Sequence, residues 1–257
     1  MSVNATMEAA FTIVCGLPAL LMVGLTVRAL VKDRNYLLPV FLVGGVLGMF
    51  VEPILDYLGG VWWPTKGSWA AFTLLGVNIP VLVVLVYPWL LGGQGYLAYR
   101  AFTRGMNSRQ LWNLVGLFAL NDLLLETIGI KLLGVYAYFG TQPFNFWGLP
   151  LWYVPCNAIG PVVAGALTYV LRRRLTGIRC LAAAPLFPMS FLGVYAAIGF
   201  PVWISLNSNW PMWAAALAAL GTFGLGYLLV TVVAEITGTG QSPERDTERV
   251  VQFDGAV

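Results

Sequence analysis

Four acidic residues lie within apolar stretches of the sequence and form two pairs. Glu52 and Asp56 are four residues apart, as are Asp122 and Glu126, so each pair shares one face of a helix. A charged side chain at mid-membrane costs about 2.5–3.5 kcal/mol or more, which favours a functional reason for keeping several. Carboxyl groups that share a low-dielectric cavity favour a state in which one keeps its proton. The spacing therefore predicts a site with a general acid.

Further polar and aromatic residues are candidates for the same site. Glu235 is a fifth acid, and its position near the cytoplasmic end of the last apolar run also suits an interfacial role. Asparagines would orient the acid or a substrate oxygen, and aromatic faces would stabilise a cation. An interfacial belt explains Trp62 equally well. The candidate substrate-binding residues are Asn78, Asn121, Asn157, Trp62, Tyr136, Trp152, Tyr153 and Trp203.

The composition excludes several kinds of chemistry. The chain has no histidine, so it has no Ser-His-Asp triad, no imidazole-bound metal and no histidine proton relay. Its three cysteines are scattered and predict neither a zinc site nor a disulfide framework. No DDxxD run or Lys/Arg cluster lies within the apolar runs, which argues against a metal-bound diphosphate substrate. We therefore expect no metal and no cofactor, and the net charge of +3 is too small to indicate nucleic acid.

These residues must be positioned by membrane-spanning helices. The 257 residues are 59% hydrophobic and 10% charged, with a mean hydropathy of +0.79. Such a chain has room for about seven spans of roughly 20 residues. We predict an all-α transmembrane domain over residues 1–237 and a polar, disordered cytoplasmic tail over residues 238–257. The predicted spans are 8–31, 37–58, 69–97, 111–139, 147–171, 181–206 and 211–237.

The basic residues predict the orientation of these spans. Twelve of the fourteen lie in the first, third and fifth connections and in the tail, leaving only Lys66 and Lys131. By the positive-inside rule the N-terminus is outside and the C-terminus is cytoplasmic. We expect a multi-pass protein of the cell membrane.

Short similarities predict internal two-helix repeats after the first helix. Glu52 is followed eight residues later by Gly60-Val61-Trp62, and Glu126 by Gly134-Val135-Tyr136. We also expect Pro53 and Pro80 to kink their helices and free backbone groups in a cavity wall.

The chain resembles the seven-helix integral-membrane terpene cyclases of meroterpenoid and indole-diterpene biosynthesis. The resemblance lies in its length, its seven spans, its lack of histidine and its acids late in the second and seventh helices. It implies protonation of a terminal epoxide or alkene of a prenyl chain, with Glu52 and Glu235 as the acid pair. The depth of Glu235 departs from that pattern, and Asp122 or Glu126 is the better physical partner. The stretch from Glu126 to Tyr138 also resembles membrane carotenoid hydratases and cyclases.

Our leading hypothesis is a metal-free terpene cyclase, an isomerase or lyase of isoprenoid biosynthesis that guides a carbocation to ring closure. Its partners would be an apolar isoprenoid or prenylated small molecule and the lipid bilayer. The alternatives are a small proton-coupled carrier, a lipid-binding membrane protein using the same carboxylates, and a structural subunit.

Overall fold

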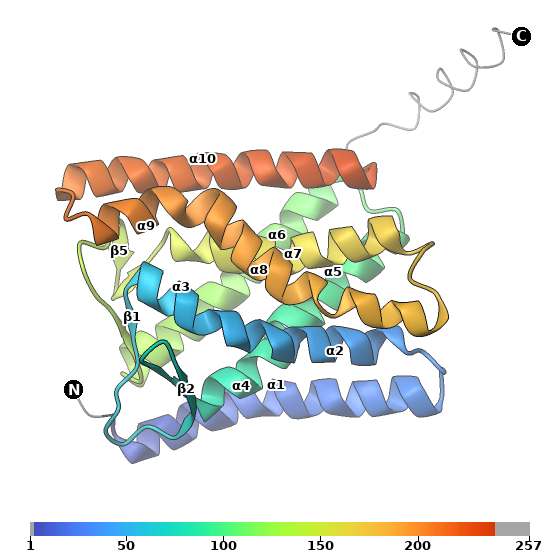
Figure 1. The fold of residues 1–257 in the computed structure, drawn as a ribbon, viewed down its shortest axis with the longest axis horizontal. Coiled ribbons are helices and arrows are strands. Elements are labelled where there is room, and N and C mark those ends of the chain that lie inside the picture. The colour runs from blue at the N-terminus through green and yellow to red at the C-terminus, as the bar shows by residue number, and fades with distance from the viewer. Residues whose placement is uncertain (1–2, 240–257) are drawn as a thin grey trace, which may run out of the picture.

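A computed structural model describes residues 3–239, and in it the chain is mostly helical (Figure 1). Among these residues, seven helical stretches are long and apolar enough to cross a membrane, which confirms the prediction of a multi-pass, seven-span protein. Most of the predicted tail, from residue 240 onward, lies outside the described residues. The seven stretches are Ala5–Val31, Leu37–Gly59, Val81–Thr103, Ser108–Leu132, Tyr153–Leu171, Gly177–Asn207 and Met212–Thr237.

Several of the spans are interrupted helices. The α-helices are α1 (Ala5–Val31), α2 (Leu37–Gly48), α3 (Glu52–Gly59), α4 (Val81–Tyr87), α5 (Gln94–Thr103), α6 (Ser108–Thr127), α7 (Tyr153–Leu171), α8 (Leu186–Val194), α9 (Phe200–Asn207) and α10 (Met212–Thr237). Two segments are 3₁₀-helical, namely η1 (Met49–Val51) and η4 (Gly177–Ala183). Three are π-helical, a geometry often found at functional sites, namely η2 (Pro88–Gly93), η3 (Ile128–Leu132) and η5 (Tyr195–Gly199).

Successive spans run in opposite directions, so alternate connections meet at the same end of the bundle (Figure 1). The start of α6 lies beside the end of α10, where Ser108 Oγ donates a hydrogen bond to the carbonyl oxygen of Thr239 at 2.9 Å. The connections after α1, α5 and α7 also lie at this end, and together with the helix turns beside them they carry most of the basic residues. The bundle therefore has one basic end.

The predicted third span was wrong over its first part. Residues 70–80 form an antiparallel hairpin of β2 (Ala70–Leu74) and β3 (Val77–Pro80). Leu75 and Gly76 have φ values of 54° and 77°, as a primed two-residue turn requires. Pro80 is extended and precedes α4, so it does not kink a helix. Hydrophobic content favoured a helix here, but the turn and the proline placed the chain in strands.

The fourth and fifth spans were predicted too long at their facing ends. The helix ends at Leu132, and Gly134, with a φ of 60°, reverses the chain. Three short strands precede α7: β4 (Ala137–Tyr138), β5 (Asn145–Phe146) and β6 (Leu149–Pro150), the last two paired with each other. β4 pairs antiparallel with β1 (Val61–Trp62). This pairing joins the connections that follow α3 and η3.

Close backbone packing holds α2 against η2. A Cβ atom at Gly45 would lie 2.6 Å from the carbonyl oxygen of Tyr87, and one at Gly92 would lie 2.5 Å from that of Phe41. Any larger side chain would force the two segments apart. The contact places Tyr87, at the end of α4, next to the span that carries Glu52.

Candidate functional site: an acid cavity

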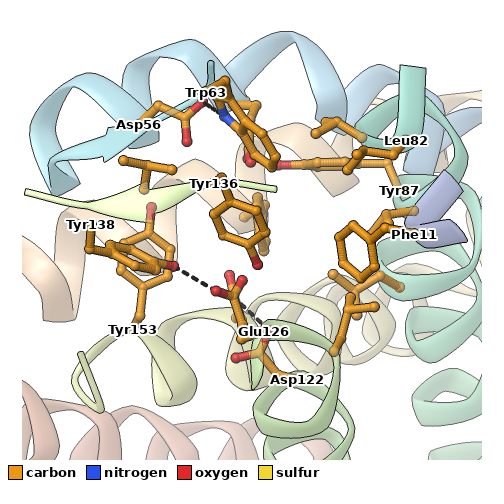
Figure 2. A pocket seen from close by; sticks show the side chains of 18 residues that line it. Phe11, Asp56, Trp63, Leu82, Tyr87, Asp122, Glu126, Tyr136, Tyr138 and Tyr153 are labelled. Atoms are coloured by element: carbon orange, nitrogen blue, oxygen red, sulfur yellow. Dashed lines mark hydrogen bonds between the residues drawn. The ribbon is translucent and has the colours of Figure 1, made fainter. Parts of the chain in front are cut away.

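A cavity of about 60 Å³ lies where α1, α3, α4, η2, α6, α7, α8 and the β1–β4 connections meet (Figure 2). We call it the acid cavity. Its lining contains four carboxyl groups and no lysine or arginine. The lining residues are Phe11, Glu52, Asp56, Val61, Trp63, Leu82, Val83, Val86, Tyr87, Leu90, Asp122, Leu125, Glu126, Tyr136, Tyr138, Tyr153, Asn157 and Phe191.

Helix α3 supplies two of the carboxyl groups. Glu52 is at its first turn, directly after the 3₁₀ segment η1, and accepts a hydrogen bond from the hydroxyl of Tyr87. Asp56 follows one turn later, and its Oδ2 accepts a hydrogen bond from Trp63 Nε1 at 2.9 Å. Asp56 is 1% exposed, and its Oδ1 is buried with no hydrogen-bond partner among residues 3–239.

Helix α6 supplies the other two. Asp122 Oδ1 accepts a hydrogen bond from Asn157 Nδ2 at 2.8 Å, and the hydroxyl of Tyr195 donates to Asn157 Oδ1. Tyr195 thereby fixes the Asn157 amide so that its NH₂ group faces Asp122. Asp122 is also 1% exposed, and its Oδ2 has no partner in the part of the chain that the structure describes. Glu126 Oε2 accepts a hydrogen bond from the hydroxyl of Tyr138 at 2.9 Å (Figure 2).

The two helices thus present the same kinds of contact, although the glutamate precedes the aspartate in α3 and follows it in α6. Each carries a glutamate bonded to a tyrosine, and an aspartate held by a nitrogen donor with one oxygen left unpartnered. The glutamates are half-buried, whereas the aspartates are almost fully buried. The glutamates therefore have the greater access to the cavity space, and the aspartates lie behind them.

Aromatic rings form much of the rest of the wall. The rings of Trp63 and Tyr136 lie 4.4 Å apart between centroids, and those of Tyr138 and Tyr153 lie 5.0 Å apart. The ring of Tyr136 also lies beside that of Phe11 from α1, with 6.4 Å between the ring centroids. Such faces attract a positive charge and exclude water. Burial raises the pKa of the Tyr138 phenol well above its usual range, and the Glu126 carboxyl raises it further, so Tyr138 acts as a hydrogen-bond donor.

The structure brings seven of the thirteen sequence candidates into this lining. They come from the two acid pairs, from one asparagine and from two tyrosines. Figure 2 labels five of them, including Asp122 and Glu126 from one helix and Asp56 from the other. The seven are Glu52, Asp56, Asp122, Glu126, Asn157, Tyr136 and Tyr153.

The remaining acid and two asparagines lie elsewhere. Glu235 is exposed in the last turn of α10, at the basic end of the bundle. Asn78 lies in the β2–β3 hairpin, where its Oδ1 accepts a hydrogen bond from Thr73 Oγ1 at 2.5 Å. Asn121 precedes Asp122 by one residue, so it points about 100° away around α6 and lines a different cavity.

Three tryptophan candidates also lie outside the lining. Trp62 packs edge-on against Phe139, with 5.8 Å between ring centroids. Trp152 is fully buried behind Tyr153, and its Nε1 donates a hydrogen bond to Gln142. Trp203 stacks on Tyr195 at 6.1 Å. Trp152 thus supports the wall residue Tyr153, and Trp203 supports Tyr195, which holds the wall residue Asn157.

Sequence reasoning missed three hydrogen-bond donors to the carboxyl groups, Trp63, Tyr87 and Tyr138. Trp63 adjoins Trp62, so an interfacial belt is an equally good explanation of it in the sequence alone. Tyr138 had a usable signal, because residues two apart on an extended strand share a face and Tyr136 was already a candidate. The sequence gives no signal for Tyr87, because its partner Glu52 lies 35 residues away.

Within residues 3–239, no group of three or more His, Cys, Asp or Glu side chains is arranged to hold a metal ion. Comparisons with protein-family models, curated proteins and solved structures found no match to this chain. The fold and site therefore define a multi-pass membrane protein with an acid cavity walled by aromatic rings.

Proposed function

We propose that this protein is a membrane-embedded terpene cyclase that acts on an apolar isoprenoid without a metal. The observation that carries the proposal is the convergence of two carboxyl pairs, from α3 and α6, on one aromatic cavity with no basic residue in its lining. A site of this kind can donate a proton, tolerate a developing cation and restrict the access of water.

Glu52 and Glu126 would carry the proton transfers, because they have the greater access to the cavity. One glutamate protonates the oxygen of a terminal epoxide, the C–O bond breaks, and the electrons of a neighbouring C=C form the new C–C ring bond. The other, as a carboxylate, takes a proton from the final cation, and a C=C bond forms. The product is an isomer of the substrate. If the substrate carries a terminal alkene instead of an epoxide, the first glutamate protonates a carbon atom of that alkene.

The aspartates would set the proton affinity of the glutamates. Each buried aspartate has one oxygen without a partner, a costly position for a full negative charge and one that a retained proton relieves. Glu126 takes the place of Glu235 as the second acid implied by the family resemblance, because Glu235 lies at the opposite end of the bundle.

The size of the cavity limits what it holds. A volume of about 60 Å³ suits several water molecules, at about 10–15 Å³ each by the same measure. It is too small for an entire prenylated molecule. The proposal therefore places only the reacting end of the substrate between the carboxyl groups and requires the wall to move when the rest enters.

The orientation in the membrane follows from the basic end of the bundle. We propose an outside N-terminus and a cytoplasmic C-terminus in the cell membrane, with the acid cavity in the outer half. The two-helix repeat would account for the matching glutamates of α3 and α6.

The proposal is tested with membranes that contain the full-length chain, incubated with prenylated small molecules that carry a terminal epoxide. We expect products of unchanged mass and altered retention in liquid chromatography–mass spectrometry. The double variant Glu52→Gln/Glu126→Gln should form none above the background of membranes lacking the protein. Product formation at the wild-type rate by this variant would overturn the assignment.

A proton-coupled carrier is the second candidate, favoured by the two unpartnered carboxyl oxygens in a site with no fixed positive charge. It predicts flux of an unaltered substrate into proteoliposomes, driven by a pH gradient and lost in the same double variant. A structural subunit predicts that neither product formation nor flux depends on these glutamates.

A further inference from the structure

A second cavity lies between α1, α5 and α6 and extends to the basic end of the bundle. It is a groove of about 620 Å³, ten times the volume of the acid cavity. Its walls are largely apolar and come from lipid-facing helices, with Leu21 and Leu25 of α1 among the exposed residues. We call it the basic groove. A groove of this length and polarity has the shape of a site for a chain-bearing amphiphile.

The mouth of the basic groove carries the charges. Arg28 of α1 and Arg100 of α5 line it, together with Asp33 and Asn35 from the connection after α1. Arg100 Nη1 and Asn35 Nδ2 both donate hydrogen bonds to the hydroxyl of Tyr96, each at 3.2 Å. This shared contact ties the connection to α5. Two guanidinium groups against one carboxylate leave one net positive charge, which matches a single phosphodiester.

The interior of the groove contains two side-chain amides that lack protein partners. Gln94 is only 7% exposed, and within residues 3–239 its side chain takes part in no hydrogen bond. Asn121, on the facing helix α6, has a buried Nδ2 for which the described residues offer no acceptor. A buried N–H group without an acceptor is costly, so Asn121 Nδ2 is a place for an acceptor oxygen from a ligand. The amide of Gln94 on the wall of the groove is a second donor for such an oxygen.

The spacing of these features follows the length of a lipid. Gln94 and Arg100 are six residues apart on α5, which is about 9 Å along the helix. An acceptor at this depth below a phosphate corresponds to the ester-linked start of an acyl chain. The apolar walls then continue along α1 and α6.

We propose that the basic groove is a binding site for an anionic phospholipid. The phosphate contacts Arg28 and Arg100, the ester oxygens accept hydrogen bonds from Gln94 and Asn121, and one acyl chain lies along α1. Asp33 disfavours a more highly charged headgroup and accepts a hydrogen bond from a headgroup hydroxyl, so phosphatidylglycerol is the expected ligand. In the proposed orientation, the positively charged end of the groove lies at the level of the anionic lipids of the cytoplasmic leaflet.

The experiment is native mass spectrometry of the full-length protein in detergent, titrated separately with phosphatidylglycerol and with phosphatidylcholine of identical chains. We expect a one-to-one complex with phosphatidylglycerol at a concentration where phosphatidylcholine gives at least fivefold less. The double variant Arg28→Gln/Arg100→Gln should lose this preference. The control Arg173→Gln/Arg174→Gln removes the same charge from exposed positions at the same end and should keep it.

A further variant tests the interior of the groove. Gln94→Leu is close in volume and keeps every charge, so it should weaken phosphatidylglycerol binding without abolishing the preference over phosphatidylcholine. Circular dichroism and thermal unfolding of each variant check that it remains folded. Equal binding of the two lipids by the wild type, or the same loss in the control variant, would overturn the proposal. So would the absence of any complex.

Discussion

The acid cavity and the basic groove belong to the same bundle but treat charge in opposite ways. The four carboxyl groups of the acid cavity lie within the bundle, and each is held by a neutral donor from another segment. The arginines of the basic groove lie at helix ends and are exposed, and the one protein contact of the Arg100 guanidinium given above, to the Tyr96 hydroxyl, leaves its other N–H groups for lipid headgroups. Internal carboxyl groups need fixed partners, whereas long basic side chains reach the interface by themselves.

The difference also concerns rigidity. Contacts across the sequence surround the acid cavity, for example Tyr195 with Asn157 and Asn157 with Asp122. At the basic groove, within residues 3–239, the one hydrogen bond between side chains of different segments joins Asn35 to Tyr96. We therefore expect the carboxyl groups of the acid cavity to stay in place while its wall moves to admit substrate, and the side chains of the groove to adapt to their ligand. Substitutions in one should leave the activity of the other intact.

The largest expected effect comes from single glutamate substitutions. Glu52→Gln and Glu126→Gln should each lower product formation by about 100-fold to 10,000-fold, because each removes one proton-transfer group. Glu235→Gln should stay within about twofold, since that side chain lies far from the cavity. Initial rates on membranes with equal amounts of protein provide the measurement.

The same variants also test the family resemblance. If Glu235→Gln caused a large loss of product formation and Glu126→Gln a small one, the second acid would be Glu235 of α10 and not Glu126 of α6. Phosphatidylglycerol binding should be unchanged in all three. A parallel loss of lipid binding would show that the cavity and the groove are not independent.

The second prediction concerns the segment that both sites share. Residues of η2 contribute Leu90 to the acid cavity and Trp89 to the basic groove. Gly45→Ala places a Cβ against the Tyr87 carbonyl and should lower stability by about 1–3 kcal/mol, impairing both functions. Gly24→Ala is the matched control, because its Cβ meets no atom within 4 Å. Thermal unfolding in detergent should show a lower melting temperature for Gly45→Ala than for Gly24→Ala. Equal melting temperatures would contradict this account.

A smaller effect is expected from Tyr138→Phe. This change keeps the ring in the cavity wall and removes only the hydroxyl that donates to Glu126. The loss of about 1 kcal/mol corresponds to roughly fivefold in rate. Steady-state kinetics should show the fall in kcat, with lipid binding unaffected. An unchanged kcat would indicate that Tyr138 contributes only its ring.

The smallest effect belongs to the groove. Gln94→Leu should weaken phosphatidylglycerol binding by about twofold to threefold, the low end of the range expected for one neutral hydrogen bond. Cyclised product should form at the wild-type rate. Lipid titration and product analysis on the same preparation test both statements. A fall in product formation would mean that the groove acts in the reaction of the cavity.

Much of the architecture was predictable because hydrophobicity and charge are local properties. Seven apolar runs gave seven spans, and the basic residues gather at one end of the bundle as the spacing of the runs requires. The third span shows the limit of this reasoning. Its first residues are apolar enough for a helix, yet the primed turn at Leu75 and Gly76 and the extended Pro80 make a hairpin.

The candidate site was only partly predictable. The spacing of Glu52 with Asp56, and of Asp122 with Glu126, placed each pair on one helix face, and the structure agrees. Which side chains meet these acids depends on contacts between segments. Asn121 and Asp122 are neighbours in sequence but line different cavities, because successive residues of a helix point about 100° apart.

The sequence by itself determined the number of spans, the absence of histidine chemistry and the two carboxyl pairs, since composition and helical periodicity require no knowledge of distant contacts. Only the tertiary structure decided that both pairs face one cavity, that Tyr87 and Asn157 bind their acids, and that Glu235 lies apart. These outcomes depend on close approaches such as that of Gly45 to the Tyr87 carbonyl, which bring together residues far apart in the chain.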